Sequence, residues 1–433
     1  MKEKNVLKNG LTLITDLNEH LSTVTFSVYF TVGSAYENYS NLGITHLVEH
    51  MFFRQLNGIS QKKLYFIMES LSGTINGFTT REYTCFEYTV IDEYAQEAFD
   101  LMKNILCDFH WTQEELEREK KIVIKEIELL GNRYDLAEDY QIGIKKYYEP
   151  IKGYIETVDN ITLEDVNNWK EIYFSPENAC FIVTGNYLNI DNNFKKQLSD
   201  IPYGSKKNVK KTFTPPKAYK RSFRDYRFPA EQGDIADVRI FFDVDLRQVS
   251  WICTQIVFDI FACGNGSKLS FSLKDTNALT DDIYSSIFAS SNNYAKIDIN
   301  WSVSNEQLFE SLDLFFDQLD SVKKSIGEDE LTSSINFSTI NAKKMHDDSL
   351  KIASMYGFYD FIADIPFSVK DSVNAKEIIC LKDIEKTAKK IFDLSNMFVC
   401  ISANRKIIKK RALKNYFYNK TNPQENDMIF CHN

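Results

Sequence analysis

The same order of elements is written twice in this chain, as TLEDVNNWKEIYFSPENACFIVTGN at residues 162–186 and as CLKDIEKTAKKIFDLSNMFVCISAN at residues 380–404. Each stretch begins with an amphipathic helical pattern, passes through a short polar loop and ends in an apolar run typical of a strand. Thr162 and Asp165 have the spacing of a helix-capping pair, which marks the start of the first helix. The repetition predicts a duplicated unit that contains both helices and strands.

The preceding part of each half follows a common order as well. Two strand-like runs, at residues 74–91 and 283–303, are each followed by an amphipathic helical pattern, at residues 93–109 and 305–324. Strands follow one another directly across turns such as the one at Asn9, so antiparallel pairing is favoured over strict alternation with helices. We therefore expect an α+β protein of two duplicated domains, each a mainly antiparallel sheet flanked by helices.

A basic, proline-containing stretch separates the halves. The chain has 433 residues, and residues 201–232 carry four of its eight prolines. Such a composition is typical of an exposed linker, although a basic stretch can also bind an anionic surface. We expect domains at residues 1–200 and 233–433, joined by this linker.

Composition excludes several classes of protein. The formal net charge is −10, from 51 basic and 61 acidic residues, which argues against nucleic acid as a partner. The longest apolar run, residues 251–263, is too short to cross a bilayer, and residues 1–15 lack a secretory signal pattern. Eight cysteines without a CxxC pair indicate reduced thiols. These features predict a cytoplasmic protein without a membrane span.

The motif that carries chemistry lies in GITHLVEHMFF, residues 43–53, where His46, Glu49 and His50 form H-x-x-E-H. On a helix the two histidines share a face and can bind one metal ion, while Glu49 can hold a water that the metal activates. Chance would place this pattern in such a chain on the order of 0.01 times. The alternative is two core or surface histidines that happen to be four residues apart.

A third metal ligand must come from elsewhere, and a second predicted helix offers one. This helix starts at a capping box, Thr112 and Glu115, and carries Glu119 and Glu126 seven residues apart on one face. Apolar neighbours bury the helix around Glu126, where an inward carboxylate is costly unless it binds something. The alternative for Glu126 is a solvated helix carboxylate.

H-x-x-E-H with a carboxylate 76 positions after the second His resembles the inverzincins, the insulinase, pitrilysin and mitochondrial-processing-peptidase family of zinc endopeptidases, family M16. The resemblance implies a short, two-domain subunit of the bacterial type, with the fold of processing peptidases and LuxS-like metallohydrolases. It implies that His46, His50 and Glu126 bind one zinc ion, that Glu49 is the general base and that Glu119 supports the catalytic site.

Other strings extend the resemblance. KNGLTLIT at residues 8–15 is similar to the family's opening hairpin, and TINGFTTREYTCFEY at residues 74–88 is similar to its N-A-x-T-x-x-E-x-T-x-Y strand, with Gly77 in place of Ala. In the family the strand edge at the position of Asn76 helps to hold an extended substrate by β-addition. A turn-capping Asn is the alternative for Asn76.

The substrate clamp of the family is altered. Where the family has an Arg and a Tyr in a string like LREKxGLAYS, residues 273–285 read LKDTNALTDDIYS. Lys274 stands at the Arg position and Asp281 near the Tyr position, with Tyr284 three residues further on. Lysine lacks the planar guanidinium fork, and an aspartate repels a developing oxyanion. Lys274 and Tyr284 remain the candidates for substrate binding in this half.

Together these features predict a zinc-dependent endopeptidase that cleaves unfolded peptides or leader segments through metal-activated water. The alternatives are a maturase dedicated to one peptide product and a non-catalytic subunit of a processing complex. Two α+β units form only one wall of a closed chamber. We therefore expect a heterodimer with a related subunit that bears the Arg and Tyr, in preference to a homodimer. Serine-hydrolase, P-loop and dinucleotide motifs are absent, and CGNGSKLS at residues 263–270 is predicted to be a turn that begins a helix.

Overall fold

The computed structural model describes residues 2–71, 73–130, 149–202, 224–227, 233–291, 293–370, 373–374 and 379–421. The chain divides into two compact units. Unit 1 comprises Met1–Phe213 and Asn341–Ser372, and unit 2 comprises Thr214–Ile340 and Val373–Asn433. The expected single boundary at residues 201–232 is therefore incomplete, because a segment from the C-terminal half belongs to unit 1.

Unit 1 is built on a six-stranded sheet with the order β1-β2-β8-β3-β7-β6. Its strands are β1 (Glu3–Val6), β2 (Thr12–Leu17), β3 (Thr23–Phe30), β6 (Thr74–Thr79), β7 (Thr84–Ile91) and β8 (Ala179–Gly185). The neighbouring strands are antiparallel except for β2 and β8, which run parallel. Strand β6 ends the order, so within the described ranges its outer edge pairs with no other strand.

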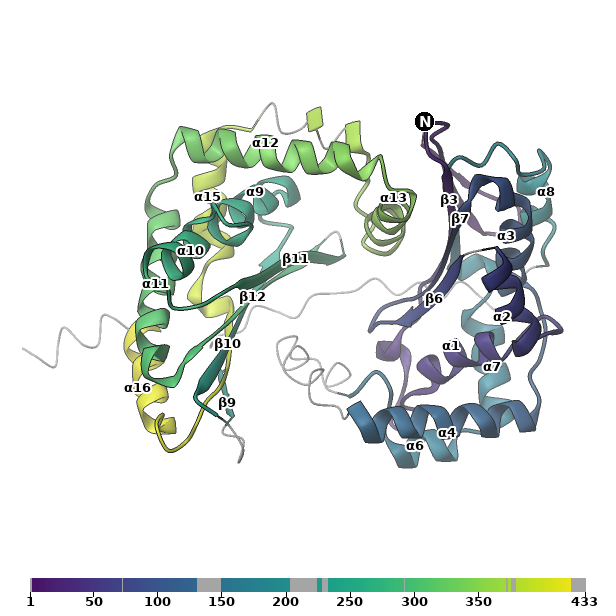
Figure 1. Ribbon diagram of the computed structural model, residues 1–433, viewed down its shortest axis with the longest axis horizontal. Helices are drawn as coiled ribbons and strands as arrows, with labels where there is room; N and C mark the ends of the chain where they lie inside the picture. Colours follow the sequence, from purple (N-terminus) through teal and green to yellow (C-terminus); the bar gives the residue numbers. More distant parts are fainter. Residues whose placement is uncertain are drawn as a thin grey trace, which may run out of the picture. The chain divides into compact units, whose positions relative to one another are not determined.

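One face of this sheet is covered by helices (Figure 1). Among the described residues of unit 1, the helices that precede residue 200 are α1 (Ile44–Arg54), α2 (Gln61–Ser70), α3 (Ala95–Met102), α4 (Gln113–Leu130), α6 (Ile155–Asn160), α7 (Leu163–Tyr173) and α8 (Phe194–Ser199). A two-stranded ribbon, β4 (Gln55–Leu56) and β5 (Ile59–Ser60), joins α1 to α2. The core between sheet and helices is aromatic-rich, and it brings Phe52 of α1 against Phe86 of β7 with ring centroids 4.9 Å apart.

The opposite face of the sheet is covered by a segment from much later in the chain. This segment consists of α13 (Ser349–Met355) and a π-helical turn (Tyr356–Ile362), which pack on β3 and β8. The hydroxyls of Ser349 and Thr25 lie 2.8 Å apart, and the Thr184 hydroxyl donates to the carbonyl of Ser349 at 2.6 Å. Small polar side chains that would suit a solvated strand face are therefore buried under a helix.

Unit 2 repeats the architecture with a five-stranded sheet of order β11-β12-β10-β13-β9. Its strands are β9 (Arg224–Arg227), β10 (Ile235–Asp245), β11 (Ile283–Ser291), β12 (Tyr294–Ser304) and β13 (Met397–Ser402). Its helices are α9 (Trp251–Ala262), α10 (Lys268–Ser270), α11 (Leu308–Lys324), α12 (Glu328–Met345, whose last residues belong to unit 1), α15 (Leu381–Ile391) and α16 (Lys410–Thr421). The hairpin β11–β12 followed by α11 matches the hairpin β6–β7 followed by α3, as the duplicated pattern predicts.

The predicted linker needs a correction. Residues 203–223 and 228–232 lie outside the described residues, but Arg224–Arg227 forms β9 and pairs in parallel with β13. Those four residues are part of a sheet and not an exposed linker. The hydrogen-bonding partner of β9 is β13, a parallel strand from near the end of the chain, so the local composition of residues 224–227 does not predict the pairing.

The predicted helix starts agree closely with the structure. The backbone amide of Thr112 donates to Glu115 Oε2 at 2.8 Å, and Thr162 and Asp165 form the same reciprocal capping box at the start of α7. The helix predicted at residues 93–109 is shorter, because only Ala95–Met102 is α-helical and 3₁₀ turns flank it. Within the described ranges, none of the helices combines the length and apolar character that a bilayer crossing requires.

Candidate metal centre

Helix α1 presents the three residues of the H-x-x-E-H motif, and its start is fixed by a buried carboxylate. Glu37 Oε2 accepts from the amide of Gly43 at 2.7 Å, and its Oε1 accepts from the amide of Thr45 at 2.8 Å. These bonds satisfy two of the amides that every helix N-terminus leaves open. Burial raises the pKa of Glu37 to about 7, although both amide bonds oppose that rise. Glu37 thus sets where α1 begins, and with it the direction of the motif side chains.

The two histidines and Glu126 of α4 converge on one point. His46 Nε2 lies 3.9 Å and His50 Nε2 lies 3.7 Å from Glu126 Oε2. One ligand atom from each residue lies within 4.8 Å of the other two, and the described residues contain no other such group of His, Cys, Asp and Glu. Tetrahedral zinc with its usual ligand distances needs donor atoms about 3.3–3.6 Å apart. The two distances to Glu126 Oε2 exceed this range by a few tenths of an ångström, and the widest donor separation, at most 4.8 Å, exceeds it by up to about 1.2 Å, so the group fits zinc once the side chains close around the ion.

The protonation of His46 suits a metal ligand. Burial holds the pKa of His46 well below its ordinary value, and the charges of His50 and Lys152 lower it further. A neutral imidazole keeps the nitrogen lone pair that a metal requires. His46 therefore needs no proton removed at neutral pH before it can bind an ion.

Glu119 and Arg54 form the support behind His50. Glu119 is buried, and its Oε2 lies 3.4 Å from His50 Nδ1. Arg54 Nε donates to Glu119 Oε1 at 2.5 Å. Burial tends to lower the pKa of His50, but the bond to Glu119 and the surrounding carboxylates raise it overall. Glu119 thus lies where it can orient a metal-binding imidazole, the usual arrangement around such ligands.

Glu49 lies beside the metal group and against the edge strand. Its Oε2 accepts from Thr79 Oγ1 of β6 at 2.9 Å, and burial raises its pKa above the ordinary glutamate value. At the neighbouring Gly77 an added Cβ would lie 2.7 Å from a ring carbon of Phe53 and 3.1 Å from Glu49 Oε1. This explains the Gly in place of Ala, because the Phe53 ring already fills the space next to the carboxylate.

Comparisons with known proteins show the family of the chain. A family model described as Insulinase (Peptidase family M16) matches residues 13–141, and one described as Peptidase M16 inactive domain matches residues 160–337. The chain belongs to peptidase family M16. It is 27% identical over 203 residues to the uncharacterized zinc protease YmxG of Bacillus subtilis, a match that covers 46% of this chain and 49% of that protein.

Other relatives extend this picture. A probable mitochondrial-processing peptidase subunit beta of Arabidopsis thaliana is 27% identical over 184 residues, covering 41% of this M16 chain and 35% of that protein. The chain thus matches half or less of the length of these two relatives. A solved protease structure from Helicobacter pylori has a TM-score of 0.75 at 17% identity and covers 93% of this chain and 99% of its own. A peptidase M16 inactive domain from Pseudomonas fluorescens has a TM-score of 0.79 at 14% identity, covering 93% and 98%. These likenesses confirm the α+β fold.

The predicted substrate residues lie in different units of the M16 chain. Asn76 is exposed within β6 and donates from Nδ2 to Glu87 Oε1 at 3.2 Å across the strand pair, so it is not a turn cap. Lys274 lies in unit 2, in the π-helical turn Phe271–Thr276, and Tyr284 is exposed on β11. His46, His50, Glu49, Glu119 and Glu126 all belong to unit 1.

Sequence reasoning missed several side chains that bind the carboxylates of the site. Lys152 Nζ lies 2.8 Å from Glu126 Oε1, Arg54 binds Glu119, and Thr79 binds Glu49. Arg54 was detectable in principle, because it follows His50 by four residues and so shares its helix face. Lys152 and Thr79 come from a loop and a strand whose approach to α1 only the tertiary fold determines.

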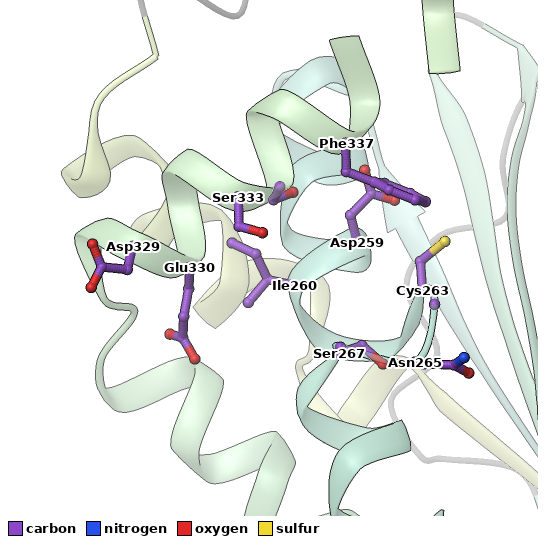
Figure 2. A pocket seen from close by; sticks show the side chains of 12 residues that line it. Asp259, Ile260, Cys263, Asn265, Ser267, Asp329, Glu330, Ser333 and Phe337 are labelled. Carbon is purple, nitrogen blue, oxygen red and sulfur yellow. The ribbon is translucent and has the colours of Figure 1, made fainter. Parts of the chain in front are cut away.

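A pocket of about 380 Å³ lies elsewhere, between α9 and α12 of unit 2 (Figure 2). Its lining residues include Asp259, Cys263, Glu330 and Phe337. Lys268 Nζ forms an ion pair with Glu330 Oε1 at 2.5 Å. The predicted turn at residues 263–270 forms one wall, where the Ser267 side chain caps α10. The pocket contains none of the residues predicted to bind metal or substrate.

Proposed function

We propose that this chain is a zinc-dependent endopeptidase that cleaves unfolded peptides or leader segments. The observation that carries the proposal is the convergence of His46, His50 and Glu126 on one point, with the buried carboxylate of Glu49 beside it. Zinc held by these three ligands would polarise a peptide carbonyl and make water a nucleophile near neutral pH. We infer one zinc ion per chain, because the described residues hold one such group.

The side chains around the metal group have separate tasks in this proposal. Glu49 accepts a proton from the attacking water and passes it to the leaving amine, the task of a general base. Thr79 holds that carboxylate in place through its hydroxyl. Glu119 and Arg54 keep the His50 ring in one orientation.

The edge strand next to Glu49 supports an extended substrate. Strand β6 carries Thr79, which binds Glu49, and the outer edge of β6 has no strand partner in the described part of the chain. An extended peptide can add to such an edge through main-chain hydrogen bonds, which select conformation more than side-chain identity. This route favours unfolded segments over folded proteins as substrates.

Chelation is expected to abolish peptide hydrolysis reversibly. The purified chain, alone and together with a related subunit that carries the Arg and Tyr clamp, is incubated with a library of quenched fluorescent peptides. Removing metal with a chelator should stop cleavage, and stoichiometric zinc should restore it, because the proposed nucleophile is a water that the metal activates. Cleavage that persists in metal-free protein would contradict the proposal.

We further propose that the active form contains two chains. Lys274 and Asp281 stand where the family resemblance implies an Arg and a Tyr, so a related subunit is the favoured source of the clamp and a second copy of this chain is the alternative. Some relatives are named as subunits, among them a mitochondrial-processing peptidase subunit beta of Saccharomyces cerevisiae.

The dimer proposal is tested by measuring activity and sedimentation in parallel over a dilution series. Activity should fall with dilution as the assembly dissociates, and the clamp-bearing subunit should raise it at every concentration. Full activity from a monomer at high dilution would refute the two-chain arrangement. Full activity from this chain alone as a dimer would assign the clamp to its own residues.

A further inference from the structure

Lys152 pairs with one of the two oxygens of the Glu126 carboxylate, and the two imidazoles face the other. Its Nζ lies 2.8 Å from Oε1, whereas Oε2 is the oxygen that faces both imidazoles, at 3.7 and 3.9 Å. Both side chains are mostly buried, with exposed fractions of 22% for Lys152 and 28% for Glu126. A carboxylate without such a partner can turn both oxygens toward a cation.

The backbone around Lys152 is fixed against the start of α1. Gly43 and Gly153 both have positive φ, +91° and +73°. An added Cβ at Gly43 would lie 2.5 Å from the carbonyl oxygen of Lys152, and one at Gly153 would lie 2.3 Å from that of Leu42. The two backbones are therefore in direct contact, and only glycine allows this approach. The same contact that places the motif helix also places the lysine.

We propose that Lys152 is a positioning residue that holds Glu126 as a one-oxygen ligand of the metal. The ammonium occupies Oε1 and leaves Oε2 to complete a set of three single-atom ligands. Zinc in a hydrolytic site keeps a fourth position for water, and a second carboxylate oxygen would compete for it. The inference rests on the metal site proposed above and goes beyond it by naming what keeps that position open.

Electrostatics alone does not account for this lysine. A cation beside a metal site repels a divalent ion, so the charge of Lys152 opposes metal binding. The contribution of Lys152 must therefore lie in geometry. It determines which oxygen of Glu126 is free and in which direction that oxygen points. This distinction gives the inference a signature different from that of a simple counter-charge.

The test replaces zinc by Co²⁺, whose visible absorption weakens as its coordination number rises. Lys152→Met should bind Co²⁺ at full occupancy with weaker visible absorption, because Glu126 then uses both oxygens. In the zinc form kcat should fall about tenfold or more, the usual scale for a lost partner of a metal ligand, with little change in KM. Lys121→Met, at an exposed position of α4, is the matched control.

The outcomes separate the two proposals. An absorption spectrum and a kcat of Lys152→Met that equal those of Lys121→Met would overturn the role of Lys152 and leave the metal site intact. Tighter Co²⁺ binding with an unchanged spectrum would show that Lys152 acts only as a charge, and this also overturns the inference. A wild-type protein that binds no Co²⁺ and no zinc would refute the proposed function itself.

Discussion

Glu49→Gln should keep zinc bound and lose peptide hydrolysis by at least about a hundredfold, the scale expected for removal of a general base. The amide has nearly the shape of the carboxylate and can still accept from Thr79, which lies 2.9 Å from Glu49 Oε2. It cannot accept the proton of the attacking water. The measurement combines metal content with initial rates on a cleaved peptide.

Glu128→Gln is the matched control for this experiment. Glu128 is exposed on α4, the helix that carries Glu126, so its replacement makes the same chemical change away from the site. The control should hydrolyse peptide at the wild-type rate. If Glu49→Gln did so too, Glu49 would not be the base.

Removal of a metal ligand should empty the site. His50→Ala and Glu126→Ala each leave two of the three converging ligands, and the loss of affinity should exceed the 10–100-fold typical of a residue behind the ligands. After dialysis against a weak chelator, elemental analysis should find zinc in the wild type and little in either variant. Activity should disappear in parallel.

His110→Ala is the control for the ligand variants, because His110 is exposed and lies outside the metal group. It should retain zinc at the wild-type level. Full zinc occupancy in both His50→Ala and Glu126→Ala would overturn the ligand assignment. Loss of secondary structure in one variant would shift the decision to the other, since the two residues lie on different helices.

The sequence predicts those parts of the site that depend on the period of one helix. His46, Glu49 and His50 lie within one turn and a half of α1, and Glu119 and Glu126 lie two turns apart on α4. Local spacing therefore places each set on one face before any tertiary contact is known. The duplicated hairpins and their helices follow from periodicity in the same way.

The sequence does not predict the features of the fold and the site that arise where segments distant in the chain come into contact. Lys152 reaches Glu126 from a loop held by the glycine contact at the start of α1. Strand β9 forms inside a stretch with the composition of a linker, because β13 offers it a ladder. The cover on the second face of the unit 1 sheet was missed because Thr25 and Thr184 are residues that suit water as well as a buried hydrogen bond.

The segment of α13 and the π-helical turn, which covers the second face of the unit 1 sheet, makes the folding of unit 1 depend on the order in which the chain is synthesised. Ser349 seals the sheet through Thr25 and Thr184, and near the N-terminus Lys2 Nζ donates to the carbonyl of Phe367 at 2.6 Å. The contacts of Thr25 with Ser349 and of Lys2 with Phe367 each span more than 300 residues, and contacts of such length raise the contact order and slow folding. A ribosome that has released only residues 1–213 therefore displays the motif helix on a sheet with one bare face. Unit 1 gains its last layer only after much of unit 2 has been made, which leaves the nascent chain open to chaperones and to aggregation during that interval.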